Sequence, residues 1–138
     1  MKEKKFVLFL HSGAYDKLYQ AIMLAVTAAS MGQTVYIFLF FWALRKFVND
    51  NLDEITFPAD LCEEEKRLLE AVPRGSSNML KEILQEVAKM GNLKIYACSG
   101  AVKLMELDEE LVKSRVDDTI GLPTMLKMAE GAETQLYI

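Results

Sequence analysis

The chain has 138 residues, of which 51% are hydrophobic and 9% aromatic. This is enough apolar material for a folded core and excludes a disordered chain. The formal net charge is −4, which argues against nonspecific nucleic-acid binding because that requires a basic face, although one local basic patch could still exist. We expect one domain over residues 1–138 that does not bind nucleic acid.

The first half of the chain predicts two strands with a helix between them. The apolar run 6–10 is typical of a strand that is covered on both faces. Apolar residues at helical spacing follow from Asp16 and stop at Gly32, a residue type that commonly ends helices. Residues 34–40 are rich in β-branched and aromatic side chains and predict the second strand, and a short helix or loop follows it.

An uncharged stretch over residues 18–44 is long enough to cross a lipid bilayer. Its middle, residues 30–34, is a polar turn, and its two halves have different periods. A helix and a strand that are buried together explain the stretch better, so we expect no membrane span.

Residues 49–77 form the least regular part of the sequence, with prolines and a cluster of small polar residues. Within it, the run from Asp60 to Glu63 resembles a capping box and predicts a helix to about Val72. We expect this segment to be an insertion or an interface element.

The second half alternates helices and strands more clearly. The predicted elements are a helix over 80–90, a strand from Leu93 to Cys98, a helix over 101–107, a turn from Asp108 to Val112, a helix over 122–130 and a strand over 134–138. Such alternation is typical of an α/β fold with a parallel sheet between two layers of helices.

Binding sites in parallel sheets lie beyond the carboxyl ends of the strands. Three predicted turns meet this condition, at residues 11–13, 41–43 and 98–100. If the first strand and the strand that ends at Cys98 are neighbours, the three turns would form one crevice.

Cys98 is the candidate catalytic residue. It lies between a predicted strand and the start of a predicted helix, where unpaired N–H groups and the helix dipole favour a thiolate. A thiolate is the form that attacks sulfur and carbon. A cysteine at a strand end is also often a small apolar filler, and that interpretation stays open.

The other cysteine and the histidine have weaker signals. Cys62 lies 36 positions before Cys98, beside three glutamates that disfavour a thiolate, which favours a structural or incidental thiol over a resolving partner for Cys98. With His11 as the only histidine, we expect no metal site. His11 could act as an acid or base near the thiol, or make only a hydrogen bond in its turn.

The remaining candidates line the three turns. Main-chain N–H groups at Ser12 and Gly13 could hold an anion, although one glycine is a weak signal. Phe41 and Trp42 could wall the crevice or pack at a subunit interface. Lys103 could stabilise a thiolate or guide an anionic donor, or be a solvated surface lysine. The full set of candidates that line the site is His11, Ser12, Gly13, Phe41, Trp42, Ser99, Gly100 and Lys103.

Several short motifs occur in a characteristic order. They are Ser12-Gly13, Asp16-Lys17, Met31-Gly32, Phe41-Trp42, Ala97-Cys98, Leu104-Met105, Gly121 and Leu136-Tyr137-Ile138. In order and spacing they resemble the DsrE/DsrF-like sulfur-relay family, particularly its peroxiredoxin-like branch. The sequence departs from that branch at Ala43, where a glycine is common, and at the residues that follow Cys98. Residues 57–77 have no clear counterpart.

The resemblance implies a flavodoxin-like three-layer sandwich with a mostly parallel sheet of about five strands, assembled into homo-oligomers. It also implies that Cys98 carries sulfane sulfur as a persulfide, between a donor and an acceptor that are proteins or small sulfur compounds. No cofactor is required by this chemistry.

Two other functions stay open. The chain could be a non-catalytic interaction or regulatory subunit in which Cys98 is only core filler. A nucleotide- or flavin-binding module is disfavoured because the sequence has neither GxGxxG nor a P-loop. The charged start of the chain, with only five apolar residues before His11, does not resemble a secretory signal, so we expect a cytoplasmic location.

Overall fold

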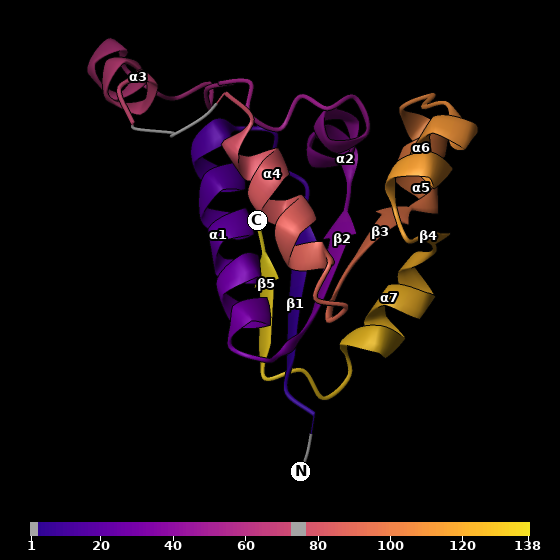
Figure 1. Ribbon diagram of the computed structural model, residues 1–138. Coiled ribbons are helices and arrows are strands. Elements are labelled where there is room, and N and C mark those ends of the chain that lie inside the picture. The colour runs from indigo at the N-terminus through magenta and orange to yellow at the C-terminus, as the bar shows by residue number, and fades with distance from the viewer. Residues whose placement is uncertain (1–2, 73–76) are drawn as a thin grey trace.

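The computed structural model describes residues 3–72 and 77–138 and shows an α/β sandwich built on one parallel sheet (Figure 1). The strands are β1 (Lys5–Leu10), β2 (Thr34–Leu39), β3 (Leu93–Cys98), β4 (Asp118–Ile120) and β5 (Thr134–Tyr137). Their order across the sheet is β4-β3-β2-β1-β5, and all four pairings are parallel. The expected flavodoxin-like three-layer fold is confirmed.

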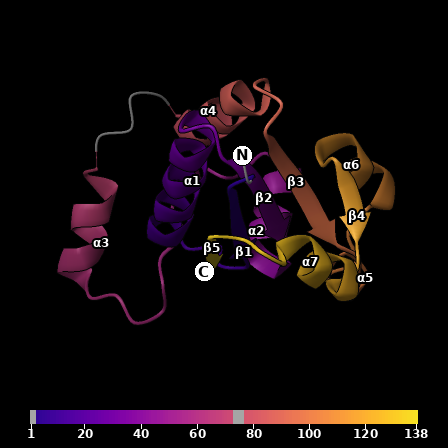
Figure 2. The ribbon, with the colours of Figure 1, turned by 90° about the horizontal axis from the view of Figure 1, so that it is seen from below.

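Helices connect the strands and cover both faces of the sheet. They are α1 (Tyr15–Ser30), α2 (Phe41–Val48), α3 (Glu63–Glu70), α4 (Met79–Ala88), α5 (Ser99–Leu104), α6 (Glu109–Arg115) and α7 (Leu122–Ala129). α1 packs beside α4 on one face, and α7 lies on the opposite face (Figure 2). The return from β4 to β5 runs opposite to the earlier crossovers, so a right-handed connection places α7 on the other side.

The two faces of the sheet differ in chemistry. On the face toward α1 and α4, the register aligns Leu8, Ile37 and Ile95 in one aliphatic row. On the other face it aligns rings, with Phe9 beside both Phe38 and Tyr137. We call these the aliphatic face and the aromatic face.

Small residues let α1 lie close to the aliphatic face. Ala21, Ala25 and Ala29 have no exposed surface, which brings the helix backbone against the strands. Gly32 follows with φ of 86°, a left-handed conformation that glycine adopts without steric cost. The predicted helix and its stop are therefore confirmed. No helix among the described residues is long and apolar enough to span a membrane.

Several element boundaries differ from those expected. β4 is a fifth strand that the sequence did not indicate, because its three residues are all at least partly exposed and show no apolar pattern. α5 begins at Ser99, directly after β3, and α6 continues past Val112 to Arg115. β1 and β3 are not neighbours, because β2 lies between them.

The irregular segment contains α3, which projects from the body of the molecule (Figures 1 and 2). No residue of α3 is buried. Its N-cap is Cys62 and not Asp60, and the Cys62 N–H donates to Glu65 Oε2 at 2.9 Å, which explains why the helix starts later than expected. The helix ends at Glu70, before the expected Val72. Positions 73–76 of this segment lie outside the described residues. An insertion or interface role for 49–77 stays a prediction.

Candidate functional site

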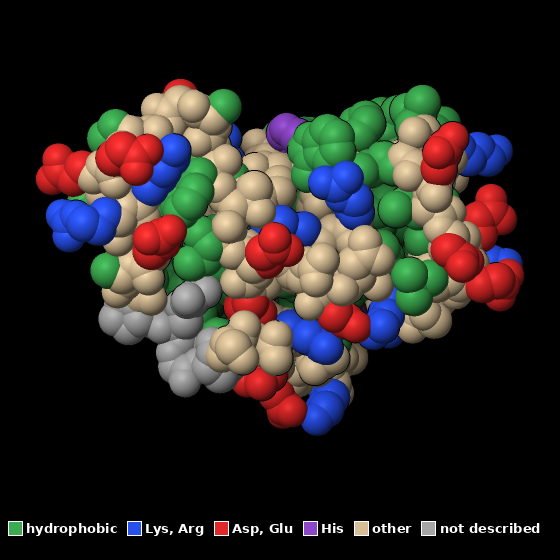
Figure 3. Space-filling view, turned by 90° about the horizontal axis from the view of Figure 1, so that it is seen from above, with side chains coloured by type: hydrophobic (Ala, Val, Ile, Leu, Met, Phe, Trp, Pro, Cys, Tyr) green, Lys and Arg blue, Asp and Glu red, His purple; other side chains and the backbone are tan. Residues whose placement is uncertain are grey.

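The three predicted turns lie at one edge of the sheet. β1, β2 and β3 are adjacent and parallel, so their carboxyl ends come to the same edge, although β2 separates the other two. Figure 3 views the molecule from above, onto this edge, and shows hydrophobic side chains gathered on part of it. The three turns are at the carboxyl ends of their strands, as expected, but the condition for a single crevice, that the first strand and the strand ending at Cys98 are neighbours, is not met.

The turn after β1 is fixed by main-chain hydrogen bonds to both sides. The His11 N–H donates to the Ile138 carbonyl at 2.8 Å, which ties the turn to the end of the chain. The His11 carbonyl accepts from the Ala43 N–H at 3.1 Å, which ties it to the first turn of α2. Ser12 Oγ accepts from the Ala14 N–H at 3.2 Å and so closes the turn itself. These contacts hold the loop in place without using the histidine ring.

The turn after β2 has an unusual backbone. Phe41, the first residue of α2, has φ of 41°, a left-handed value that is costly for a bulky residue. Its exposed fraction is 39%, and that of Trp42 is 50%. The Arg45 guanidinium carbon lies 5.0 Å from the centre of the Trp42 ring, within reach of a cation–π interaction. Two aromatic rings and one cation therefore project at this edge.

Cys98 ends β3 and is the N-cap of α5, as the sequence predicted. It follows Tyr96 by two residues in the strand, and the Tyr96 ring lies 5.8 Å from the Phe38 ring, so Cys98 points to the aromatic face. Its exposed fraction is 7%. The thiol is thus near the surface at the site edge but largely covered.

His11 and Cys98 lie on opposite sides of Phe40. Phe40 follows β2 in an extended conformation and stacks on Phe9, which places its ring on the aromatic face. Two strand spacings separate β1 from β3, or about 10 Å. No hydrogen bond joins His11 to Cys98 among the described residues. A proton-transfer role for His11 stays a prediction and would require a water or substrate between them.

Ser99 and Lys103 line a separate small cavity of about 150 Å³ between α5, α6 and β4. Cys98 does not line this cavity. The exposed Lys103 is in the last turn of α5, away from the first turn where the thiol lies. The structure therefore separates Lys103 from the thiol by the length of a short helix.

An apolar hollow of about 280 Å³ lies at the same edge. It is lined by Phe9, His11, Phe40, Phe41 and Tyr137. The sequence did not place Phe9, Phe40 or Tyr137 among the candidates that line the site, because their proximity depends on strand register. The aromatic content of strand 34–40 was the available signal for Phe40. The Phe9 and Tyr137 rings stack at 4.6 Å with an angle of 10° between their planes.

Tyr96 is the titratable group on the aromatic face whose pKa is displaced. Burial raises its pKa above the ordinary value of 10.0, and the nearby Tyr36, Asp117 and Asp118 act in the same direction. The phenol two residues before Cys98 therefore stays neutral across the physiological range. No three His, Cys, Asp or Glu side chains of the described residues are grouped so that they could hold a metal ion.

Comparison with known proteins finds similar sequences and structures that share this fold. Residues 2–61 match the model of the DsrE/DsrF/DrsH-like family, a range that includes the first two turns of the site but not Cys98. The uncharacterized protein YrkE of Bacillus subtilis is 25% identical over an alignment of 98% of this chain and 97% of that protein.

Two solved structures share the fold over nearly their full length. The ychN protein of E. coli has a TM-score of 0.63 at 13% identity, covering 99% of this chain and 100% of its own. BT1422 of Bacteroides thetaiotaomicron, a conserved protein of unknown function, has a TM-score of 0.62 at 12% identity, covering 98% and 95%. These structures show that the chain shares their fold, and residues 2–61 are similar to the DsrE/DsrF/DrsH-like family.

Proposed function

We propose that this protein is a cytoplasmic sulfur carrier that holds sulfane sulfur as a persulfide on Cys98. The observation that carries the proposal is the position of Cys98, at the end of β3 and on the edge where the turns after β1 and β2 also lie. The match of residues 2–61 to the DsrE/DsrF/DrsH-like family model supports a place among sulfur-relay proteins. The proposed partners are a sulfur donor, a sulfur acceptor and further copies of the chain.

The proposed transfer needs no cofactor and no net oxidation. The Cys98 thiolate attacks the outer sulfur of a donor persulfide, a new S–S bond forms, and the donor's own S–S bond breaks to release a thiolate. The acceptor thiolate then attacks the outer sulfur on Cys98 and regenerates the Cys98 thiolate. Each step moves one sulfur atom and leaves the number of electrons unchanged.

The surroundings of Cys98 suit a persulfide that must be protected from water. The side chain faces the aromatic side of the sheet, and Phe40 occupies the neighbouring position at the end of β2. Apolar surroundings keep water and unrelated thiols from a reactive sulfur. The exposed Trp42 and Phe41 at the same edge provide an apolar surface on which a donor or acceptor protein could bind.

The low exposure of Cys98 favours one alternative. With an exposed fraction of only 7%, the thiol also satisfies the description of a core residue at a strand end. In that case the chain would be a non-catalytic interaction subunit, and the exposed side chains at the edge would pack against a partner. The two functions differ in whether Cys98 becomes loaded with sulfur.

The deciding experiment is intact-protein mass spectrometry after incubation with polysulfide, on wild type, Cys98→Ser and Cys62→Ser. The carrier function predicts a gain of about 32 Da per sulfur that reductant reverses. The gain should be present in wild type and Cys62→Ser and absent in Cys98→Ser.

Cys62 is the matched control because it is the exposed cysteine, so an adduct there would report nonspecific loading of an accessible thiol. An adduct that disappears in Cys62→Ser and persists in Cys98→Ser would refute the carrier mechanism at Cys98. The absence of any adduct on folded wild-type protein would leave the interaction subunit as the better description.

A further inference from the structure

A cavity of about 320 Å³ lies on the aliphatic side of the sheet, and Cys98 is not among the residues that line it. Its walls come from α4, from the ends of α2 and α6, and from Ile95 in β3. Ile95 belongs to the aliphatic row of the sheet, whereas Cys98 points to the aromatic face. The cavity and the thiol are therefore on opposite sides of β3.

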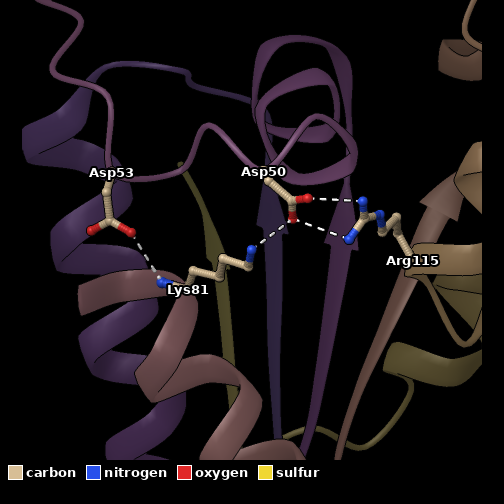
Figure 4. A network of polar contacts seen from close by, with 4 residues as sticks. All are labelled: Asp50, Asp53, Lys81 and Arg115. Carbon is tan, nitrogen blue, oxygen red and sulfur yellow. Dashed lines mark hydrogen bonds and ion pairs between the residues drawn. The ribbon is translucent and has the colours of Figure 1, made fainter. Parts of the chain in front are cut away.

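Three charged side chains meet at this cavity (Figure 4). Arg115 binds the Asp50 carboxylate with both terminal nitrogens, Nη1 to Oδ1 at 3.2 Å and Nη2 to Oδ2 at 2.8 Å. Lys81 Nζ lies 3.3 Å from Asp50 Oδ1. Two cations from α4 and α6 thus share one carboxylate at the end of α2.

The other carboxylates nearby have partners of their own. Asp53 accepts the main-chain N–H groups of Leu80 and Lys81, at 2.9 Å and 3.2 Å, and does not line the cavity. Asp117 accepts the Ile95 N–H at 2.8 Å and lies 4.0 Å from Lys94 Nζ. Asp117 also lines the cavity but is paired with Lys94, so the group formed by Asp50, Lys81 and Arg115 has one positive charge in excess.

The remaining wall is largely apolar, and its apolar members are Phe47, Leu52, Leu84, Ala88, Ile95 and Val116. A volume of this size with a few convergent polar groups is typical of small-molecule sites. Arg and Lys side chains bind carboxylates well, and a guanidinium forms two parallel bonds to one.

We propose that this cavity binds a small organic monoanion. Its carboxylate head lies against Lys81 and Arg115, where it cancels the excess charge, and its short apolar body lies between α4 and β3. A single negative charge is favoured over a phosphate dianion, because the group has only one positive charge to neutralise. The inference does not depend on sulfur transfer at Cys98.

The test uses hexanoate as the probe and hexanamide as its neutral counterpart, with two-dimensional amide NMR on the full chain. Hexanoate should saturably shift amides around the cavity, in α4, α6 and the first half of β3. Hexanamide should bind at least about tenfold more weakly, since it lacks the charge that the two cations recognise. Equal binding of the two probes, tighter binding of hexyl phosphate, or shifts confined to the Cys98 edge would overturn the assignment.

Variants test separately the contacts to the carboxylate head and to the apolar body of hexanoate. Lys81→Gln and Arg115→Gln should each weaken hexanoate binding about tenfold. Ala88→Leu should abolish it by filling the cavity while leaving every charge in place. Lys89→Gln is the matched control, because Lys89 pairs with Glu86 outside the cavity and its side chain is 72% exposed.

Folded Lys81→Gln and Ala88→Leu proteins that bind hexanoate as wild type does would overturn the proposal, even if Arg115→Gln fails to fold. Cys98→Ser should bind hexanoate unchanged. Failure of sulfur loading at Cys98 would therefore leave this test intact, and failure of hexanoate binding would leave the sulfur-carrier test intact.

Discussion

A Cβ atom built on Gly13 would lie 2.9 Å from the Cβ of Trp42, so the turn after β1 and the first turn of α2 meet without room for one further carbon. The contact is between a main chain and the base of a side chain, and neither can rotate away. Gly13 is thus required by close packing and not by its backbone angle, since its φ is not left-handed.

We predict that Gly13→Ala destabilises the fold by about 1–3 kcal/mol, the usual cost of overpacking. Chemical denaturation gives the free energy of unfolding, and the fluorescence of the single Trp42 reports the local shift. Gly100→Ala is the matched control, because its new Cβ would lie 3.8 Å from Cys98 Sγ, an ordinary contact, within a helix. That control should be neutral or stabilising by up to about 1 kcal/mol. Equal effects of the two variants would contradict this account.

Asp53 caps α4 from 27 residues earlier in the chain. Its buried carboxylate accepts N–H groups from the first turn of that helix. We predict that Asp53→Ala lowers the free energy of unfolding by about 1–2 kcal/mol, because it leaves helix N–H groups without an acceptor. Denaturant titration measures the loss.

The control for Asp53 is Asp108→Ala, which removes an exposed cap that bonds to N–H groups within its own helix turn, those of Glu110 and Leu111. Water can replace that acceptor, so its loss should be the smaller of the two. Asp53→Asn retains one acceptor oxygen and should recover part of the stability. A larger loss for Asp108→Ala would contradict the capping role of Asp53.

The contacts of Gly13 and Asp53 show which parts of the fold could not be predicted from the sequence alone. The apolar run 6–10 and the stop at Gly32 are local patterns, so the first strand and first helix could be predicted well. The pairing of Asp53 with α4 and the contact of Gly13 with Trp42 join distant segments, and no local pattern contains them. The sequence did not predict β4 for a different reason. Its three residues are exposed or half-exposed and show no hydrophobic periodicity.

The features of the candidate site also divide into those set by local sequence and those set by strand order. The position of Cys98 between a strand and a helix follows from local patterning, and the structure has it there. That Phe40 stands between His11 and Cys98 follows from the strand order, which the sequence does not determine. The aromatic hollow likewise depends on the parallel pairing of β1 with β5, two strands at opposite ends of the chain.

Tyr96 gives a prediction about alkaline pH. Its folded-state pKa is raised, chiefly by burial, so above about pH 10 the unfolded chain loses this proton before the folded one does. The folded state then binds more protons, and stability falls as pH rises through that range. We predict that above pH 10 the free energy of unfolding falls less in Tyr96→Phe than in wild type. Near neutral pH, the free energies of the two proteins should change with pH in the same way.

Unfolding free energies of both proteins from neutral pH to the alkaline range test this, with tyrosinate absorbance of the folded protein as a second measurement. Tyr137→Phe is the comparison, because Tyr137 is 66% exposed on β5, an outermost strand of the sheet. Parallel pH profiles of wild type and Tyr96→Phe throughout the alkaline range would contradict the prediction.

Glu106 ends α5 in a conformation that suits glycine better. Its φ is 51° and its side chain is exposed. The next residue, Leu107, donates its N–H to the Val102 carbonyl, as in a Schellman motif, where glycine usually has the left-handed conformation. We predict that Glu106→Gly stabilises the fold by about 1 kcal/mol, because it removes the steric cost of a left-handed residue. Glu106→Ala keeps the Cβ and removes only the charge, so it should gain little. Thermal and denaturant unfolding of the three proteins measure the difference, and an equal gain for alanine would assign the effect to charge and not to the backbone.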